Sequence, residues 1–197
     1  MLLTTPLLVS AAFALPGPDV VFELLDDKPV PVECAASAPG GPWCRSFGVI
    51  EAPVERVADA LENMKANAHL FESIVSIDVL APDTLHVVMD YPGYLGMSDR
   101  DYVAKYTRII EGDVRRYRWV PVTHPDAPPT DNPIRLPQFE GEWKLEPHPQ
   151  GTKVTYLWQA AIAGSFPSSM YEQAWKRAGY EALKDLAHTR QATLTAP

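Results

Sequence analysis

Residues 151–188 read GTKVTYLWQAAIAGSFPSSMYEQAWKRAGYEALKDLAH, a stretch that contains a strand followed by a long helix. β-Branched and aromatic residues are concentrated in Lys153–Ala161, which is typical of a strand. Pro167 suits the first turn of a helix, because the N–H that proline lacks makes no hydrogen bond there. A helix of roughly 22 residues, rising about 1.5 Å per residue, is long enough to cross a whole sheet. We therefore expect one C-terminal helix to lie across one sheet.

The apolar residues of this predicted helix recur at helical spacing along one stripe. They are Tyr171, Ala174, Trp175, Ala178, Ala182 and Leu186, while Glu172, Lys176, Tyr180 and Lys184 fall outside the stripe. An amphipathic helix of this kind buries its apolar face against a neighbouring element, and here the sheet is that element.

Upstream of this stretch, short β-rich runs alternate with turn signals such as Pro92-Gly93. The runs are Ile74–Leu80, Leu85–Tyr91, Tyr102–Ile110, Arg115–Val122 and Gly141–Leu145. Connections this short permit hairpins but not crossover helices, so we expect an antiparallel meander. The exception is Thr123–Leu136, a long proline-rich excursion from the sheet.

The N-terminal half adds a hairpin, a strand over Arg45–Glu51 and an amphipathic helix over Val54–Ala66, so the element order predicts an α+β fold. Cys34 and Cys44 flank a Pro-Gly-Gly-Pro turn, and the two strands of a hairpin there would bring the sulfurs together. A disulfide is one expectation, and two unpaired buried thiols are the alternative.

Residues 1–14 are almost wholly apolar, end in Ala12-Phe13-Ala14 and resemble a signal peptide too short to span a bilayer. However, no Lys or Arg precedes Lys28. The alternative is an apolar N-terminal segment that packs on the domain. The first interpretation predicts export to the periplasm or beyond, in agreement with a disulfide, and the second predicts a cytoplasmic protein.

The composition limits the classes of function. A chain of 197 residues is enough for one good core and marginal for two, so we expect a single domain. The net charge of −8 repels phosphate backbones, so we expect no nucleic-acid partner. The five histidines lack metal-ligand spacing, and H-E-x-x-H, C-x-x-C and G-x-S-x-G motifs do not occur. We therefore expect no metal, no cofactor and no dedicated catalytic residue.

Several motifs resemble those of START domains, members of the SRPBCC superfamily of helix-grip proteins, including bacterial lipid-binding ones. They are Ser98–Val103, similar to the family's RDFV strand; Asn132–Arg135 with Glu140–Leu145, similar to its loop arginine and G-x-W strand; Gly151–Tyr156, similar to GTxVTY; and Gly164–Pro167, similar to GxxP. The resemblance covers residues 20–190 and leaves residues 191–197 as a C-terminal tail. It implies a curved antiparallel sheet wrapped around the long C-terminal helix, with a hydrophobic cavity between them. One departure is Gln159–Ile162, which lacks the aspartate often found before GxxP.

A cavity for a hydrophobic ligand needs apolar walls and a few polar groups that orient the ligand. The candidate apolar lining residues are Tyr102, Trp119, Trp143, Tyr156, Trp158, Tyr171 and Trp175. The alternative is that these rings fill a solid core. Several strands are apolar at both alternating positions, so the sequence does not decide which face is inside.

Arg100 and Arg135 occupy motif positions of the family and are candidates for holding a ligand head group, with Asp101 or Glu140 as partner. A buried arginine is costly unless it is paired or binds a ligand. The alternative is a surface ion pair or a brace within a loop.

These residues support three hypotheses about function. The first is a non-enzymatic protein that binds or transfers a lipid, a sterol or a similar molecule, with transient membrane contact and with Thr123–Leu136 and the last helix as a gate. The second is an enzyme resembling polyketide cyclases or hydrolases of the same superfamily, which requires a buried acid–base pair in the cavity. The third is a ligand-free interaction module with a closed core. The sequence leaves the ligand and the oligomeric state open.

Overall fold

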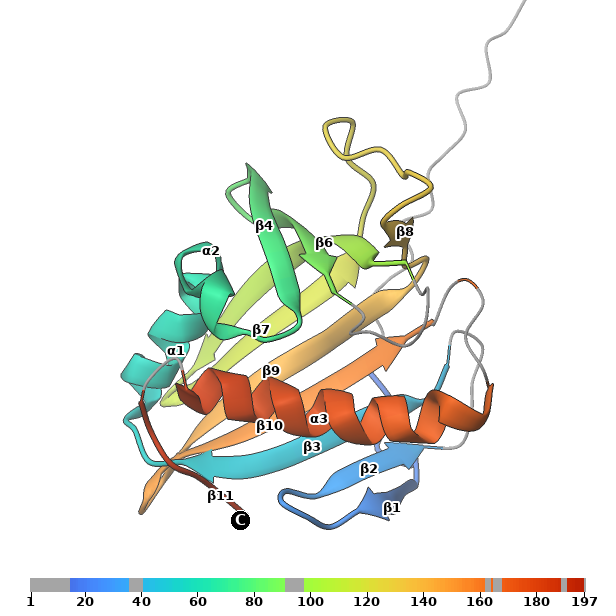
Figure 1. Ribbon diagram of the computed structural model, residues 1–197. Coiled ribbons are helices and arrows are strands. Elements are labelled where there is room, and N and C mark those ends of the chain that lie inside the picture. Colours follow the sequence, from blue (N-terminus) through green and yellow to red (C-terminus); the bar gives the residue numbers. More distant parts are fainter. Residues whose placement is uncertain are drawn as a thin grey trace, which may run out of the picture.

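The computed structural model describes residues 15–35, 41–90, 98–161, 164, 168–188 and 191–196. In this part of the chain one sheet curves around a long C-terminal helix (Figure 1). Its strands are β1 (Phe22–Asp26), β2 (Val32–Ala35), β3 (Trp43–Ile50), β4 (Ile74–Ala81), β5 (Thr84–Met89), β6 (Arg100–Glu111), β7 (Val114–Pro121), β8 (Ile134–Arg135), β9 (Phe139–His148), β10 (Gly151–Ala160) and β11 (Leu194–Thr195). The helices are α1 (Val54–Glu62), α2 (Met64–Asn67) and α3 (Tyr171–His188), with 3-10 turns η1 (Ala68–Leu70) and η2 (Ser168–Met170).

The strand order is β1-β2-β3-β10-β9-β7-β6-β5-β4, so β4, β5, β6, β7, β9 and β10 lie side by side in the order of the chain. Every pair along this order is antiparallel, which confirms the predicted meander for these strands. The N-terminal strand β3 joins the sheet beside β10. The excursion after β7 returns through β8, which pairs with β6 in parallel.

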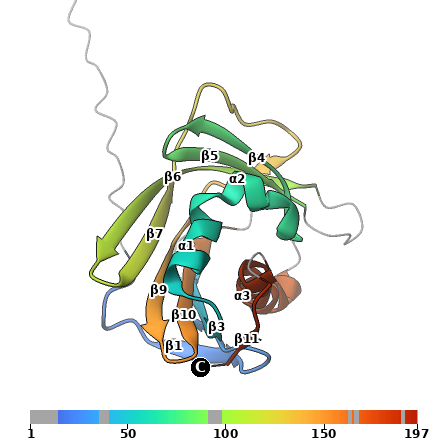
Figure 2. The ribbon, with the colours of Figure 1, turned by 90° about the vertical axis from the view of Figure 1, so that its left-hand side faces the viewer.

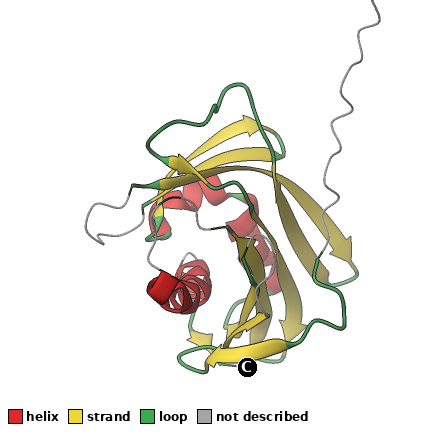
Figure 3. Cartoon of the chain, turned by 90° about the vertical axis from the view of Figure 1, so that its right-hand side faces the viewer, coloured by secondary structure: helices red, strands yellow, loops and turns green. Residues whose placement is uncertain are grey.

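The sheet curls around α3, which is seen end-on in Figures 2 and 3. Helix α3 packs on β3, β2 and β10, and α1 covers the concave face near β9 and β7. The predicted α+β helix-grip fold, with a curved antiparallel sheet around a long C-terminal helix, is confirmed by this arrangement.

Helix α3 has 18 residues and begins at Tyr171 after the turn η2, so it is shorter than predicted. Pro167, the predicted start, lies outside the described residues. Gly179 faces the sheet, and a Cβ atom there would come within 2.8 Å of the Trp158 ring and 3.0 Å of Val32. The missing side chain therefore lets α3 approach the sheet closely. Leu183 and Leu186 are buried on the same side.

The helix predicted over Val54–Ala66 ends earlier, because α1 stops at Glu62 and a separate short α2 begins at Met64. Asn63 lies between them, and its side chain donates hydrogen bonds to the backbone oxygen of Asp59 at 3.1 Å and to the Asp59 carboxylate at 2.7 Å. Asparagine side chains compete in this way with helical hydrogen bonding and favour a break.

The two cysteines lie directly opposite one another in the β2–β3 pair and form a disulfide. The predicted hairpin is therefore confirmed, and the alternative of two free thiols does not apply to this structure. The predicted signal peptide, residues 1–14, lies outside the described residues. Among the described residues, no helix combines the length and the apolar character that crossing a bilayer requires.

The C-terminal end requires a correction, because residues 191–197 are not simply a tail. Leu194 and Thr195 form β11, which pairs with Ile50 and Val49 of β3. β2 pairs with β3 only at residues 44–46, so the far end of β3 has an open edge. Backbone groups on such an edge favour pairing with another strand, and β11 supplies it.

Candidate functional site

A cavity of about 280 Å³ lies between the concave face of the sheet and α3. This volume is slightly below the range of roughly 300–1,000 Å³ that is usual for small-molecule sites. The apolar lining residues are Met64, Phe71, Ile74, Met89, Tyr102, Tyr106, Trp119, Leu136, Phe139, Trp143, Tyr156, Trp158, Ala160, Met170, Ala174, Trp175, Ala178 and Ala182. The interior is therefore not completely filled, which speaks against the hypothesis of a closed core.

The inner wall of the cavity is a cluster of aromatic rings carried by four neighbouring strands. Tyr156 of β10 is at its centre, with ring centroids 4.3 Å from Trp143, 4.7 Å from Trp158 and 5.8 Å from Trp119. The pairing register places Tyr156 opposite Trp143, which brings the two rings together. The register thus decides the inner face, which the apolar pattern of the strands did not.

Two tyrosine hydroxyls bring polar atoms into this wall. Tyr102 and Tyr106 are four residues apart on β6, so they lie on the same face and their hydroxyls hydrogen-bond to one another. Burial raises the pKa of Tyr106 to about 12, and it raises that of Tyr102 well above its ordinary value. Both phenols therefore stay neutral. Among the described residues, the buried indole N–H of Trp119 has no hydrogen-bond acceptor.

Six polar side chains line one side of the cavity, and we call them the polar rim. They are Ser73, Asp90, Gln173, Arg177, Glu181 and Asp185. Four of them follow one another at intervals of four residues and so share one face of α3. The cavity reaches the surface here, because Gln173, Arg177 and Asp90 are exposed.

The rim residues differ in how well they are paired. Arg177 Nε donates to Glu181 at 2.6 Å, so these two charges offset one another. Asp185, in contrast, is buried with 2% of its surface exposed. Its Oδ2 accepts a hydrogen bond from the backbone N–H of Glu72 at 3.0 Å, whereas Oδ1 has no hydrogen-bond donor among the described residues. Lys184 Nζ is 3.6 Å from this oxygen.

The motif residues Asp101, which is buried, and Arg135, which is partly buried, form an ion pair away from the cavity lining. Arg135 donates to both oxygens of Asp101, at 3.0 and 2.8 Å, and His86 Nε2 is 2.7 Å from the same carboxylate. Burial would raise the pKa of Asp101, but the hydrogen bonds from Arg135 and His86 outweigh it and lower the pKa. Arg135 also donates to the backbone oxygen of Ala127 at 3.0 Å, so the pair fastens the excursion to β6.

Arg100 is buried at 1% exposure and donates a hydrogen bond to the backbone oxygen of Ser98. Its guanidinium lies beside Gly164, where a Cβ atom would come within 3.4 Å of it. Arg100 and Asp101 do not pair with each other, and Glu140 accepts instead from Gln138 at 2.9 Å. None of these polar side chains lines the cavity.

The structure thus separates the predicted site residues into two groups. Tyr102, Trp119, Trp143, Tyr156, Trp158 and Trp175 line the cavity, whereas Arg100, Asp101, Arg135 and Tyr171 do not. Tyr171 instead packs against Trp175, with ring centroids 5.7 Å apart. Whether any of them contacts a ligand remains a prediction.

Sequence reasoning missed two lining residues that matter to the site. Phe139 lies outside the predicted strand, which began at Gly141, yet its ring centroid is 4.5 Å from that of Tyr102. Asp185 was also missed, although its four-residue spacing from Glu181 and Arg177 indicates a polar stripe along the helix. The predicted gate Thr123–Leu136 contributes only Leu136 to the lining.

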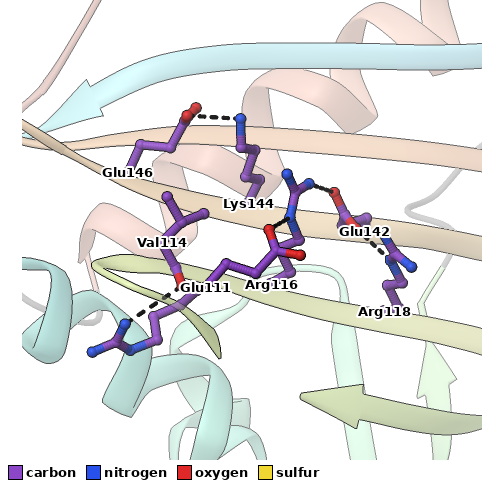
Figure 4. Close-up of polar contacts among 8 residues, drawn as sticks. Glu111, Val114, Arg116, Arg118, Glu142, Lys144 and Glu146 are labelled. Carbon is purple, nitrogen blue, oxygen red and sulfur yellow. Dashed lines mark hydrogen bonds and ion pairs between the residues drawn. The ribbon is translucent and has the colours of Figure 1, made fainter. Parts of the chain in front are cut away.

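The outer face of the sheet carries charged side chains that pair across and along its strands (Figure 4). Glu142 is buried between Arg116, at 2.6 Å, and Arg118, at 2.5 Å. Arg116 also contacts Glu111 at 3.1 Å, and Lys144 contacts Glu146 at 2.7 Å. Arg116 and Arg118 are therefore matched by carboxylates, whereas Arg115 donates to the backbone oxygens of Gly112 and Val114.

Several solved structures have a fold similar to that of this chain. Human StAR-related lipid transfer protein 5 matches with a TM-score of 0.77 at 16% identity, over 86% of this chain and 86% of that chain. A fragment of a STAR-related lipid transfer protein from Xanthomonas axonopodis gives 0.70 at 24% identity, over 86% and 99% of the two chains. A START superfamily protein from Mycobacterium smegmatis gives 0.59 at 12% identity, over 76% and 97%.

These matches establish a START-like fold for this chain. The sequence itself matches no protein-family model and no curated protein.

Proposed function

We propose, on the premise of this START-like fold, that the protein binds one hydrophobic small molecule, such as a lipid or a sterol, in the cavity beneath α3. The observation that carries the proposal is the aromatic wall around Tyr156, which leaves about 280 Å³ of space inside the sheet. Proteins in the comparison are named as lipid transfer proteins, which supports the same kind of ligand here.

The driving force for binding is the removal of apolar ligand surface from water. Each methylene group buried against the wall contributes about 0.8 kcal/mol, which is a factor of about four in Kd. The aromatic rings present rigid apolar surfaces, so little side-chain entropy is lost when the ligand enters. The exposed part of the polar rim offers the entry path.

The test is to purify the full chain and compare its mass under native and denaturing conditions, with extraction and identification of any released molecule. A discrete hydrophobic ligand, or uptake of fluorescent sterols or fatty acids, supports the proposal. A protein that is empty and takes up none of these probes contradicts it. Recovery of a chemically altered probe would instead favour the enzyme hypothesis.

A pair of matched variants links binding to the cavity. Ala182 lines the cavity, so Ala182→Phe places a ring in the space that the ligand needs. Ala66 is exposed on α2 and does not line the cavity, so Ala66→Phe makes the same change elsewhere. We expect Ala182→Phe to lower probe uptake at least about tenfold and Ala66→Phe to leave it unchanged, with both variants folded. Equal uptake by the two variants would place binding outside the cavity.

We further propose that the protein transfers its ligand between membranes and contacts them transiently. Donor and acceptor vesicles with a fluorescent lipid test this step, since transfer must become faster with added protein. A protein that binds the lipid and leaves the transfer rate unchanged would be a carrier or a sensor.

Export from the cytoplasm is also part of the proposal. It is supported by the apolar sequence of residues 1–14 and by the Cys34–Cys44 disulfide, because disulfides persist in oxidising compartments. Thiol alkylation in intact cells, followed by fractionation, tests it. Two alkylated thiols in the cytoplasmic fraction would contradict export.

A further inference from the structure

Asp185 stands out in the cavity wall because its surroundings leave half of its carboxylate without a hydrogen bond. The residue is 2% exposed, and Oδ2 accepts from the backbone N–H of Glu72 at 3.0 Å. Oδ1 is buried and has no hydrogen-bond donor among the described residues. A buried carboxylate oxygen without a donor is costly, so such a group calls for a partner that binds there.

The charges around Asp185 restrict what that partner can be. Asp90, Glu181 and Asp185 line this side of the cavity, whereas Arg177 is the one basic residue among the described lining residues. Arg177 is already bonded to Glu181 at 2.6 Å. Lys184 lies outside the lining and is bonded to Glu72 at 2.9 Å, although its Nζ is also 3.6 Å from Asp185. An anionic head group would therefore meet more negative than positive charge.

We propose that Asp185 accepts a hydrogen bond from the ligand's polar head group, so that the cavity selects amphiphiles with a hydroxyl or amine over amphiphiles with a carboxylate. This inference rests on the proposed binding function and adds the chemistry of the head group to it. The apolar tail lies against the aromatic wall, and the head group lies at the polar rim. Burial raises the pKa of Asp185, in spite of the Glu72 N–H and the charge of Lys184.

The test uses three probes with the same tail and different head groups: dodecanol, dodecylamine and dodecanoate. Each competes with a fluorescent probe bound to the full chain at about pH 8, well above the ordinary pKa of an aspartate. We expect dodecanol or dodecylamine to bind at least about tenfold more tightly than dodecanoate. Their O–H or N–H can donate to Oδ1 of Asp185, which has no donor among the described residues, whereas an ionised carboxylate has no O–H or N–H to donate.

The variant Asp185→Asn keeps the shape of the side chain and an oxygen for the Glu72 N–H, but it removes the charge and adds an N–H donor. We expect it to reduce the preference over dodecanoate about tenfold. Glu172→Gln is the matched control, because Glu172 is an exposed acid on the same helix that pairs with Lys176 and does not line the cavity. It should keep the preference of the original protein.

The outcomes separate this inference from the proposed function. Equal or tighter binding of dodecanoate by the original protein overturns the inference and leaves binding established. An unchanged preference in Asp185→Asn, with thermal unfolding showing a folded variant, overturns it as well. If no fluorescent sterol or fatty acid binds the full chain, the proposed function fails and the inference fails with it. If such a probe binds and none of the three amphiphiles displaces it, the inference alone fails.

Discussion

Gly141 marks a place where the aromatic wall leaves no room for a single methyl group. It lies on β9 opposite both Trp119 of β7 and Trp158 of β10. A Cβ atom at this position would be 2.5 and 2.6 Å from two carbons of the Trp119 ring, and it would overlap the backbone oxygen of Leu157. Carbon atoms in proteins pack at about 3.5–4.0 Å, so Gly141→Ala forces the ring or the neighbouring strand to move.

The expected magnitude follows from these contacts. Overpacking of a core costs about 1–3 kcal/mol, and overlap with a backbone oxygen places this site at the upper end. Removing a glycine stabilises by about 0.4–1 kcal/mol through the unfolded chain, which offsets part of the loss. We therefore expect a net loss of about 2 kcal/mol. With a urea m-value near 2 kcal/mol/M, the unfolding midpoint falls by about 1 M.

Urea unfolding, followed by tryptophan fluorescence and by circular dichroism, measures this change. Gly17→Ala is the matched control, because a Cβ atom at Gly17 would meet nothing within 4 Å. That variant should unfold within about 0.5 kcal/mol of the original protein. If Gly141→Ala is as stable as Gly17→Ala, the reasoning from the packing of Trp119 is refuted.

Two further predictions concern charge and covalent bonding. Asp101→Asn should destabilise the protein by about 3 kcal/mol at neutral pH, because it leaves the partly buried Arg135 without its carboxylate partner. The pKa of Asp101 is lower in the folded state than in the unfolded state. Its contribution to stability is therefore fully present above the unfolded pKa of about 3.9, and it is lost as the pH falls through the lower folded pKa. The difference between the original and Asp101→Asn, measured by urea unfolding across pH, should therefore disappear in acid, and a constant difference would argue against this pair. Reduction of Cys34–Cys44, which closes a loop with a sequence separation of 10, should cost about 2–3 kcal/mol of unfolding free energy. Urea unfolding with and without reductant measures this loss, and the double variant Cys34→Ala/Cys44→Ala is the control that reductant should not affect. An identical unfolding midpoint of the original protein with and without reductant would contradict the prediction.

Local patterns in the sequence determined the order and type of the elements. The apolar stripe of α3, the short β-rich runs and the turn signals between them predicted an antiparallel sheet with a C-terminal helix, and the structure confirms it. The Pro-Gly-Gly-Pro turn predicted the hairpin that pairs Cys34 with Cys44. These features depend on residues that are neighbours along the chain, so periodicity and turn chemistry are sufficient to find them.

The identity of the residues that line the cavity depended on tertiary structure. Tyr102 and Val103 are adjacent on β6 and both are buried, so alternation along the strand did not show which one faces the cavity. Motif position favoured Arg100 and Arg135 as head-group ligands, yet Arg135 meets Asp101 from the distant excursion and both lie away from the lining.

Asp185 is a candidate acceptor for the ligand's head group because the fold packs α3 against Glu72 and inside the curved sheet. Its role depends on burial and on the absence of a second donor among the described residues, and both arise from segments far apart in the sequence. The sequence by itself therefore determined that one antiparallel sheet packs against a C-terminal helix. Packing between segments far apart in the sequence decided where the cavity lies and which polar group faces it.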